Sequence, residues 1–383
     1  MSTTEEEGVR SIGTFQDERV VDAEFHVPIT APSVYEYVDD PKAREWFEEL
    51  GPPLPATSGW WEPYANEEMA GYSFMEELLS VPSAEERITS EDVRETMTEL
   101  GLDAVVVNPP DDFPLVDSRT PKMMNQVARA YNDYVLDRIV DPSEGIYAAM
   151  ILPFWDPPFA EAEVERIGAE EGIVAGVNWL TLDRPFGVIE YDGVLEKLAG
   201  HDLPLLLHRG PSSEFYHTMD RNLQTFVENK MTTENKTMLG AVMNMIYTGV
   251  FDAHTDLEVV IQGFGGMWIP FAADRGDEIY QVNSGDYQLT NRMYDGEYEY
   301  LPRRPSEYVH DNFYVTNCSI GLPPSEEMLE HALKVTYADE TFMYSTNWPD
   351  GEVDGAEWLD RPGIDEDTRA AILHGNAEDV FGI

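Results

Sequence analysis

The feature that most constrains the fold is a series of eight short apolar segments, most of them separated by amphipathic segments of helical period. Each apolar segment is short for a helix and has the continuous hydrophobicity of a strand buried on both faces. Strands that alternate with helices predict a parallel sheet covered by helices. The expected strands centre near residues 21, 105, 148, 176, 205, 259, 315 and 344.

Two architectures fit this alternation, a closed (β/α)8 TIM barrel and an open, doubly wound sheet. An open sheet usually carries a glycine-rich phosphate-binding turn after its first strand. Here the first strand runs instead into Glu24, Phe25 and His26. This polar ending and the number of strands favour the TIM barrel, in which the active site lies at the carboxyl ends of the strands.

A single barrel domain is expected over residues 20–383, after a polar and flexible arm at residues 1–19. After the first strand, residues 27–89 are rich in proline, glycine, tryptophan and acidic residues. That inserted loop-rich segment is long for a plain connection. We expect this excursion to lie over the mouth of the active site or in a contact between subunits.

The net charge of the chain limits the classes of partner that it can bind. There are 74 Asp and Glu residues against 24 Lys and Arg, spread along the whole chain, and the net charge is −50. Aromatic residues make up 11% of the chain, which separates it from disordered acidic proteins. Such a surface disfavours binding to nucleic acid or to anionic membranes. The even spread favours a halophilic protein, adapted to concentrated salt, over an acidic face for one basic partner.

Signals for export, membrane insertion and disulfide formation are missing from the sequence. The chain starts with a polar, acidic segment, and no apolar run approaches the ~20 residues that span a bilayer. Cys318 is the only cysteine, which excludes an internal disulfide framework. We therefore expect a soluble, cytoplasmic protein.

Three residues that can bind a metal stand at the ends of expected strands. Glu24 and His26 are two residues apart on the first strand, so their side chains can face one side. His208 ends the fifth strand, and the carboxyl ends of barrel strands meet at one rim. Two imidazoles and a carboxylate suit Zn²⁺, Mn²⁺ or Fe²⁺. The pattern predicts a metal centre built from these three side chains.

Other polar residues near the same rim are candidates for substrate binding or catalysis. Arg209 either clamps a substrate carboxylate in a bidentate contact or pairs with one of the many acidic side chains. His217 either reaches the pocket from the following loop or lies exposed on it. Asn347 and Asp350 follow the eighth strand, in a polar segment.

Seven segments carry a resemblance to a known family, and in order they cover most of residues 20–383. They are the Glu-x-His of strand one, AYNDYVLD, LPLLLHRG, LEVVIQGFGGMWIPF, RRPSEYVHDNFYVT, MYSTNWPDGEVD and ILHGNAEDVFG. Together they resemble the amidohydrolase superfamily, in the amidohydrolase 2 branch related to aminocarboxymuconate semialdehyde decarboxylase. The resemblance implies a divalent metal, most often Zn or Mn, held by the three strand-end ligands, a small carboxylated or cyclic substrate, and a homodimer.

The chain departs from the family pattern at two strand ends. The Asp of the family's eighth strand falls on Asn347, whose amide oxygen can coordinate a metal but cannot act as a base. The His that follows the family's proline falls on Asp350, which is a possible substitute for proton transfer. The usual strand-six His is missing, with Gln262 and Phe264 nearby.

These observations leave four functions open. The first two are a metal-dependent hydrolase and a non-oxidative decarboxylase, both acting on a small carboxylated or cyclic molecule. Hydrolysis depends more on the missing Asp. The third is a catalytically degenerate barrel that serves as a binding protein, which Asn347 and the missing strand-six His motivate. The fourth is an enzyme that works without metal through Arg209 and Asp350, which no spacing supports.

Overall fold

The computed structural model describes most of the chain between residues 18 and 383, with gaps. The described residues are 18–29, 31–50, 88–110, 121–180, 184–209, 228, 231–232, 235–283, 289–294, 297–316, 325–349, 359, 361 and 364–383.

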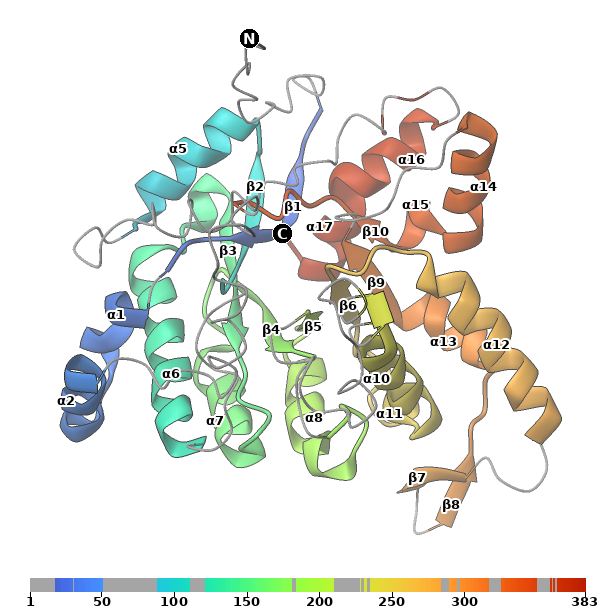
Figure 1. Ribbon diagram of the computed structural model, residues 1–383, viewed down its shortest axis with the longest axis horizontal. Coiled ribbons are helices and arrows are strands. Elements are labelled where there is room, and N and C mark those ends of the chain that lie inside the picture. Colours follow the sequence, from blue (N-terminus) through green and yellow to red (C-terminus); the bar gives the residue numbers. More distant parts are fainter. Residues whose placement is uncertain are drawn as a thin grey trace.

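Eight parallel strands form one sheet in the order β1-β2-β3-β4-β5-β6-β9-β10, and helices are arranged around them (Figure 1). The expected (β/α)8 TIM barrel is confirmed, and each of these eight strands lies on one of the eight apolar segments. The strands are β1 (Val21–His26), β2 (Ala104–Asn108), β3 (Ile146–Ile151), β4 (Ile173–Trp179), β5 (Leu205–His208), β6 (Val259–Gln262), β9 (Phe313–Thr316) and β10 (Phe342–Met343).

The helices between the strands bury one apolar face against the barrel. In α5, for example, Val93, Met97 and Leu100 are buried, and Gly101 ends the helix in the left-handed conformation. The helical elements are α1 (Ala31–Val34), η1 (Tyr35–Tyr37), α2 (Pro41–Leu50), α5 (Ser90–Leu100), α6 (Pro121–Arg138), η2 (Pro142–Glu144), α7 (Pro157–Ile167), η3 (Ile189–Tyr191), α8 (Asp192–Gly200), α10 (Asn235–Tyr247), α11 (Val250–Ala253), α12 (Trp268–Asn283), α13 (Pro305–Asn312), α14 (Glu326–Thr336), α15 (Ala338–Thr341), α16 (Glu366–Ala370), η6 (Ala371–Gly375) and α17 (Asn376–Phe381).

The chain that follows β10 closes the barrel against β1. The backbone N–H of Ala23 donates to the carbonyl of Tyr344 at 2.9 Å, and that of His26 donates to the carbonyl of Trp348 at 2.8 Å. The ring of Trp348 also stacks on Phe25, with centroids 5.0 Å apart. These contacts bring the polar segment after β10 beside the strand that carries Glu24.

Some described elements were not predicted from the sequence. Helix α12 begins right after the glycine-rich end of β6, with Pro270 in its first turn, where a proline is tolerated. An antiparallel hairpin, β7 (Leu289–Tyr294) and β8 (Glu297–Tyr300), lies away from the barrel strands at the lower right of Figure 1. The described start of the 27–89 excursion is mostly helical, in α1, η1 and α2. None of the helices in the described ranges is long and apolar enough to cross a membrane.

Candidate metal centre

Strand register brings several polar side chains to the same level of the barrel. His26 is opposite Asn108 on β2, while His208 is opposite both Trp179 on β4 and Gln262 on β6. Residues directly opposite in parallel strands face the same side of the sheet. Because the His208 ring contacts Glu24 across the barrel, its partners on β4 and β6 also face the interior. All five of these side chains are buried.

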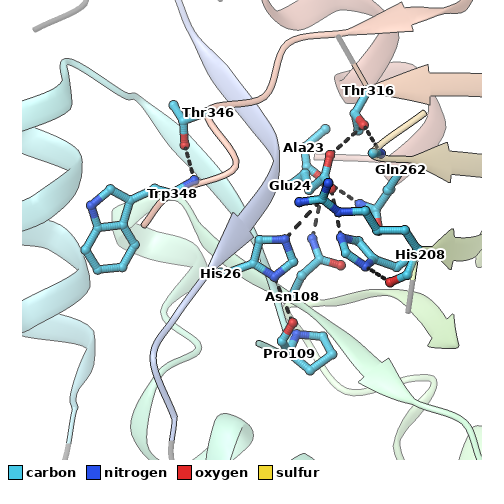
Figure 2. A network of polar contacts seen from close by, with 12 residues as sticks. Ala23, Glu24, His26, Asn108, Pro109, His208, Gln262, Thr316, Thr346 and Trp348 are labelled. Carbon is cyan, nitrogen blue, oxygen red and sulfur yellow. Dashed lines mark hydrogen bonds and ion pairs between the residues drawn. The ribbon is translucent and has the colours of Figure 1, made fainter. Parts of the chain in front are cut away.

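The three predicted ligands, Glu24, His26 and His208, converge. Their ligand atoms all lie within 4.8 Å of one another, and all three residues are buried. Glu24 Oε1 is 2.9 Å from His208 Nε2 and 3.8 Å from His26 Nε2 (Figure 2). The two imidazole rings meet edge to face, with centroids 4.9 Å apart. Their role as metal ligands is a prediction that this arrangement makes possible.

Backbone carbonyls orient both imidazoles. Nδ1 of His26 lies 2.8 Å from the carbonyl oxygen of Pro109, and Nδ1 of His208 lies 2.5 Å from that of Arg209. A carbonyl only accepts, so each Nδ1 carries a proton and each Nε2 is turned toward Glu24. There, Nε2 either shares a proton with the carboxylate or binds a cation that displaces that proton.

Glu24 is held as a carboxylate. Burial by itself raises its pKa, but hydrogen bonds and positive charge from His208 and His26 outweigh that effect and hold the pKa well below its usual range. Its second oxygen, Oε2, accepts a 2.5 Å hydrogen bond from Thr316 Oγ1 on β9. Glu24 therefore has one oxygen directed at the imidazoles and the other anchored to β9, which only β10 separates from β1 around the barrel.

A second buried acid, Asp22, ties β1 to the segment after β10. Its Oδ2 accepts from Thr346 Oγ1 at 2.5 Å and from the Thr346 backbone N–H at 3.2 Å. Burial raises the pKa of Asp22 to about 7, against the opposing hydrogen bonds from Thr346 and from the Glu24 backbone. Asp22 thus holds the strand that carries the ligand against the turn that carries Asn347.

Asn347 lies between two residues that are bonded to β1. Thr346 binds Asp22, and the carbonyl of Trp348 accepts from the backbone of His26, so Asn347 lies beside the segment of β1 that contains Glu24. Asn347 has a left-handed backbone (φ 52°), which asparagine tolerates better than most residues. Its side chain is buried, and Oδ1 has no hydrogen-bond partner within the described residues.

Of the other three predicted site residues, only Arg209 lies in the described part of the chain. Arg209 is half-buried, and its side chain passes over Gly263, where a Cβ atom would come within 3.0 Å of Arg209 Cδ. Gly263 has a positive φ of 83°, so a side chain there would strain the backbone and crowd Arg209. His217 and Asp350 lie outside the described residues.

Sequence reasoning missed the residues that support the three ligands. Thr316, Asn108 and Asp22 were not singled out, because a hydroxyl, an amide or an acid within an apolar strand has no motif of its own. The available signal was the position of these polar residues within or at the end of apolar strands, since a polar side chain in the interior of a barrel needs a partner. The amide oxygens of Asn108 and Gln262 and the Trp179 Nε1 have no hydrogen-bond partner within the described part of the chain.

The residues fit a divalent cation. Two imidazoles with protonated Nδ1 atoms and one carboxylate with an anchored second oxygen are the usual donors and supports of a Zn²⁺ or Mn²⁺ site. Three protein ligands also leave positions for substrate or water, as in catalytic sites.

Comparison with known proteins identifies the family of the chain. The sequence model of the family described as amidohydrolase (Amidohydro_2) matches residues 97–383, which is most of the chain. The chain belongs to the amidohydrolase family. A curated relative, the gamma-resorcylate decarboxylase of Polaromonas sp. strain JS666, is 25% identical over 300 residues, which cover 74% of this amidohydrolase and 85% of the relative.

Solved structures share the fold. The 5-carboxyvanillate decarboxylase of Sphingomonas paucimobilis matches with a TM-score of 0.66 and 21% identity, over 96% of this chain and 100% of the other. The dihydroxybenzoic acid decarboxylase of Polaromonas sp. JS666, with bound manganese and the inhibitor 2-nitroresorcinol, matches with a TM-score of 0.64 and 17% identity, over 95% of this chain and 97% of the other.

Proposed function

We propose that this amidohydrolase is a metal-dependent, non-oxidative decarboxylase of a small, hydroxylated aromatic carboxylic acid. The observation that carries the proposal is the convergence of Glu24, His26 and His208 on one buried point, with both imidazoles oriented by backbone carbonyls. Support for decarboxylation comes from the gamma-resorcylate decarboxylase that is 25% identical, and support for manganese from the solved decarboxylase of the same fold.

The chain would hold the substrate through groups around the three ligands. A divalent cation, when bound, polarises oxygen atoms of the substrate. Arg209 supplies a positive charge for a carboxylate at the carboxyl ends of β5 and β6. Asn108, Gln262 and Asn347 each have a buried amide oxygen that can accept a hydrogen bond from a substrate hydroxyl.

Asn347 favours decarboxylation over hydrolysis. A hydrolase needs a base that takes a proton from the attacking water, and an amide cannot take one. In decarboxylation the C–C bond breaks, CO₂ leaves, and the ring carbon keeps the electron pair and takes up a proton. That proton can come from the solvent or from a group outside the described residues, such as Asp350. The substitution at position 347 therefore removes less from this reaction than from hydrolysis.

The test combines metal content with CO₂ release. Protein purified without chelator in about 1 M salt should contain one equivalent of Mn or Zn and should release CO₂ from 2,6-dihydroxybenzoate. The Glu24→Ala and His208→Ala variants should lose both properties. His254→Ala is a matched control, since His254 is partly buried and lies 3.5 Å from Asp192, in a contact between α11 and α8. Absence of metal from the wild-type protein would refute the proposal.

Asn347 also supports a second candidate function, a barrel that binds a small molecule without turnover. In that case the wild-type protein would bind 2,6-dihydroxybenzoate and release no CO₂. Binding of 2,6-dihydroxybenzoate by the wild-type protein without CO₂ release would favour this second function. An Asn347→Asp variant that gains CO₂ release would show that the amide is what limits the chemistry.

We also propose that the protein forms a homodimer, located in the cytoplasm. Support for the dimer comes from exposed apolar side chains on or next to α12: Met267, Phe271, Ile279 and Val282 are 54%, 56%, 41% and 78% exposed. Light scattering should give twice the monomer mass, and Phe271→Glu should lower it. A monomeric wild-type protein in both low and high salt would contradict the dimer.

A further inference from the structure

Strand β1 has an irregular register around Glu24, one of the three predicted metal ligands. Asp22 and Phe25 pair with Val105 and Val107 of β2, so β1 advances by three residues where β2 advances by two. This is the signature of a β-bulge, which bends a strand and redirects a side chain, often beside an active site. Glu24 lies inside the bulge. Its direction is therefore set by local contacts rather than by the regular alternation of a strand.

Two buried amides satisfy the carbonyl that precedes Glu24. The oxygen of Ala23 accepts from Gln262 Nε2 at 3.0 Å and from Asn108 Nδ2 at 3.5 Å (Figure 2). Asn108 Nδ2 also donates to the carbonyl of Val106 at 3.2 Å. Gln262 comes from β6, which is not a neighbour of β1 in the sheet, so its side chain reaches across the interior of the barrel.

The N–H group of the same peptide bond also makes a hydrogen bond to a buried side chain. The backbone N–H of Glu24 belongs to the peptide plane that carries the Ala23 carbonyl, and it donates to Asp22 Oδ1 at 3.0 Å. With both its oxygen and its N–H bonded to buried side chains, this plane cannot rotate without losing buried hydrogen bonds. The Cα atom of Glu24 lies in that plane, so the bonded peptide fixes the point from which the Glu24 side chain starts.

The amides can make these contacts in one orientation only. Rotating the Gln262 amide by half a turn would place its oxygen against the Ala23 oxygen, and two acceptors repel each other. The amide of Gln262 thus donates to the Ala23 carbonyl, and that of Asn108 donates to the carbonyls of Ala23 and Val106. Gln262 lies near the position where the resemblance to the family leads one to expect a histidine, and this contact gives it a different role.

We propose that Gln262 and Asn108 are positioning residues of the metal centre, which clamp the Ala23–Glu24 peptide and thereby aim the Glu24 carboxylate at His26 and His208. The proposal rests on the metal-dependent function proposed above. Residues that orient a metal ligand typically change metal affinity by about 10- to 100-fold when they are replaced. The clamp predicts a loss of this size without loss of the fold.

The experiment uses full-length protein loaded with Co²⁺, whose visible spectrum reports ligand geometry, and calorimetric titration with Mn²⁺. Gln262→Met and Asn108→Leu keep the shape and remove the donors. Asn312→Leu is the matched control, because Asn312 is also buried and donates to one backbone carbonyl, that of Leu257, at 3.2 Å. Gln262→Glu serves as a second variant if Gln262→Met fails to fold.

Both clamp variants should bind Mn²⁺ about 10-fold or more weakly, with a changed Co²⁺ spectrum, while Asn312→Leu matches the wild type in both. Unchanged affinity and spectrum in the clamp variants would overturn the proposal. An equal loss in Asn312→Leu would also overturn it, because the effect would then be general to buried amides. A wild-type protein that binds no metal would instead refute the proposed function.

Discussion

The hydrogen bond between Thr316 and Glu24 offers a sharp test of the metal centre. Thr316 Oγ1 donates to Glu24 Oε2 at 2.5 Å, and both residues are fully buried. Thr316→Val replaces the hydroxyl by a methyl group of similar size. The variant therefore removes one donor from the carboxylate and leaves the shape of the barrel interior almost unchanged.

The magnitude follows from the kind of bond that is lost. A hydrogen bond to a charged group contributes about 1.5–3 kcal/mol, and ~1.4 kcal/mol corresponds to a tenfold change in a dissociation constant. If the bond anchors Glu24 for metal binding, the dissociation constant for Mn²⁺ should rise by about 10- to 100-fold. Calorimetric titration of metal-free protein measures this change directly.

Thr341→Val is the control for this substitution. Thr341 is fully buried at the end of α15, just before the amino end of β10, and its Oγ1 donates to the carbonyl of Thr336 at 2.9 Å. It should lose stability but keep its affinity for Mn²⁺. Equal affinity in Thr316→Val and the wild type would refute the reasoning that Glu24 needs an anchored second oxygen.

Three further predictions follow from charges in the structure. Burial raises the pKa of Glu163, but contacts with Arg166 and Arg129 lower it overall, so its stabilisation is present above the unfolded-state pKa and is lost as the pH falls through the lower folded-state value. Glu163→Gln should lower the free energy of unfolding by about 3 kcal/mol at neutral pH. Urea unfolding should show that this difference from the wild type shrinks at acidic pH, and a difference that does not change with pH would contradict the ion pairs. Asn347→Asp should bind Mn²⁺ more tightly by about 10-fold, because it adds a charge beside the cation; calorimetry that shows no gain would mean that position 347 does not face the metal. With a net charge of −50, the thermal midpoint, followed by circular dichroism, should rise between about 0.1 and 1 M salt. A midpoint independent of salt would contradict the prediction of a halophilic protein.

The sequence by itself determined the barrel and the three candidate ligands. Short apolar runs rich in β-branched residues, such as Ala104–Asn108, indicate a strand buried on both faces, and that signal is local. Parallel barrel strands then place their carboxyl ends at one rim, so Glu24, His26 and His208 could be grouped without coordinates. The reason is that burial and alternation leave their pattern within a few neighbouring residues, and the barrel topology then brings the strand ends together.

The tertiary structure alone decided how the site is held. Gln262 reaches Ala23 across 239 positions of sequence, and Thr316 reaches Glu24 across 292. Such contacts depend on the bulge in β1 and on the order of strands around the barrel, and neither leaves a periodic signal in the sequence. The same holds for Asn347, whose place beside β1 depends on hydrogen bonds that form only when the chain after β10 closes the barrel.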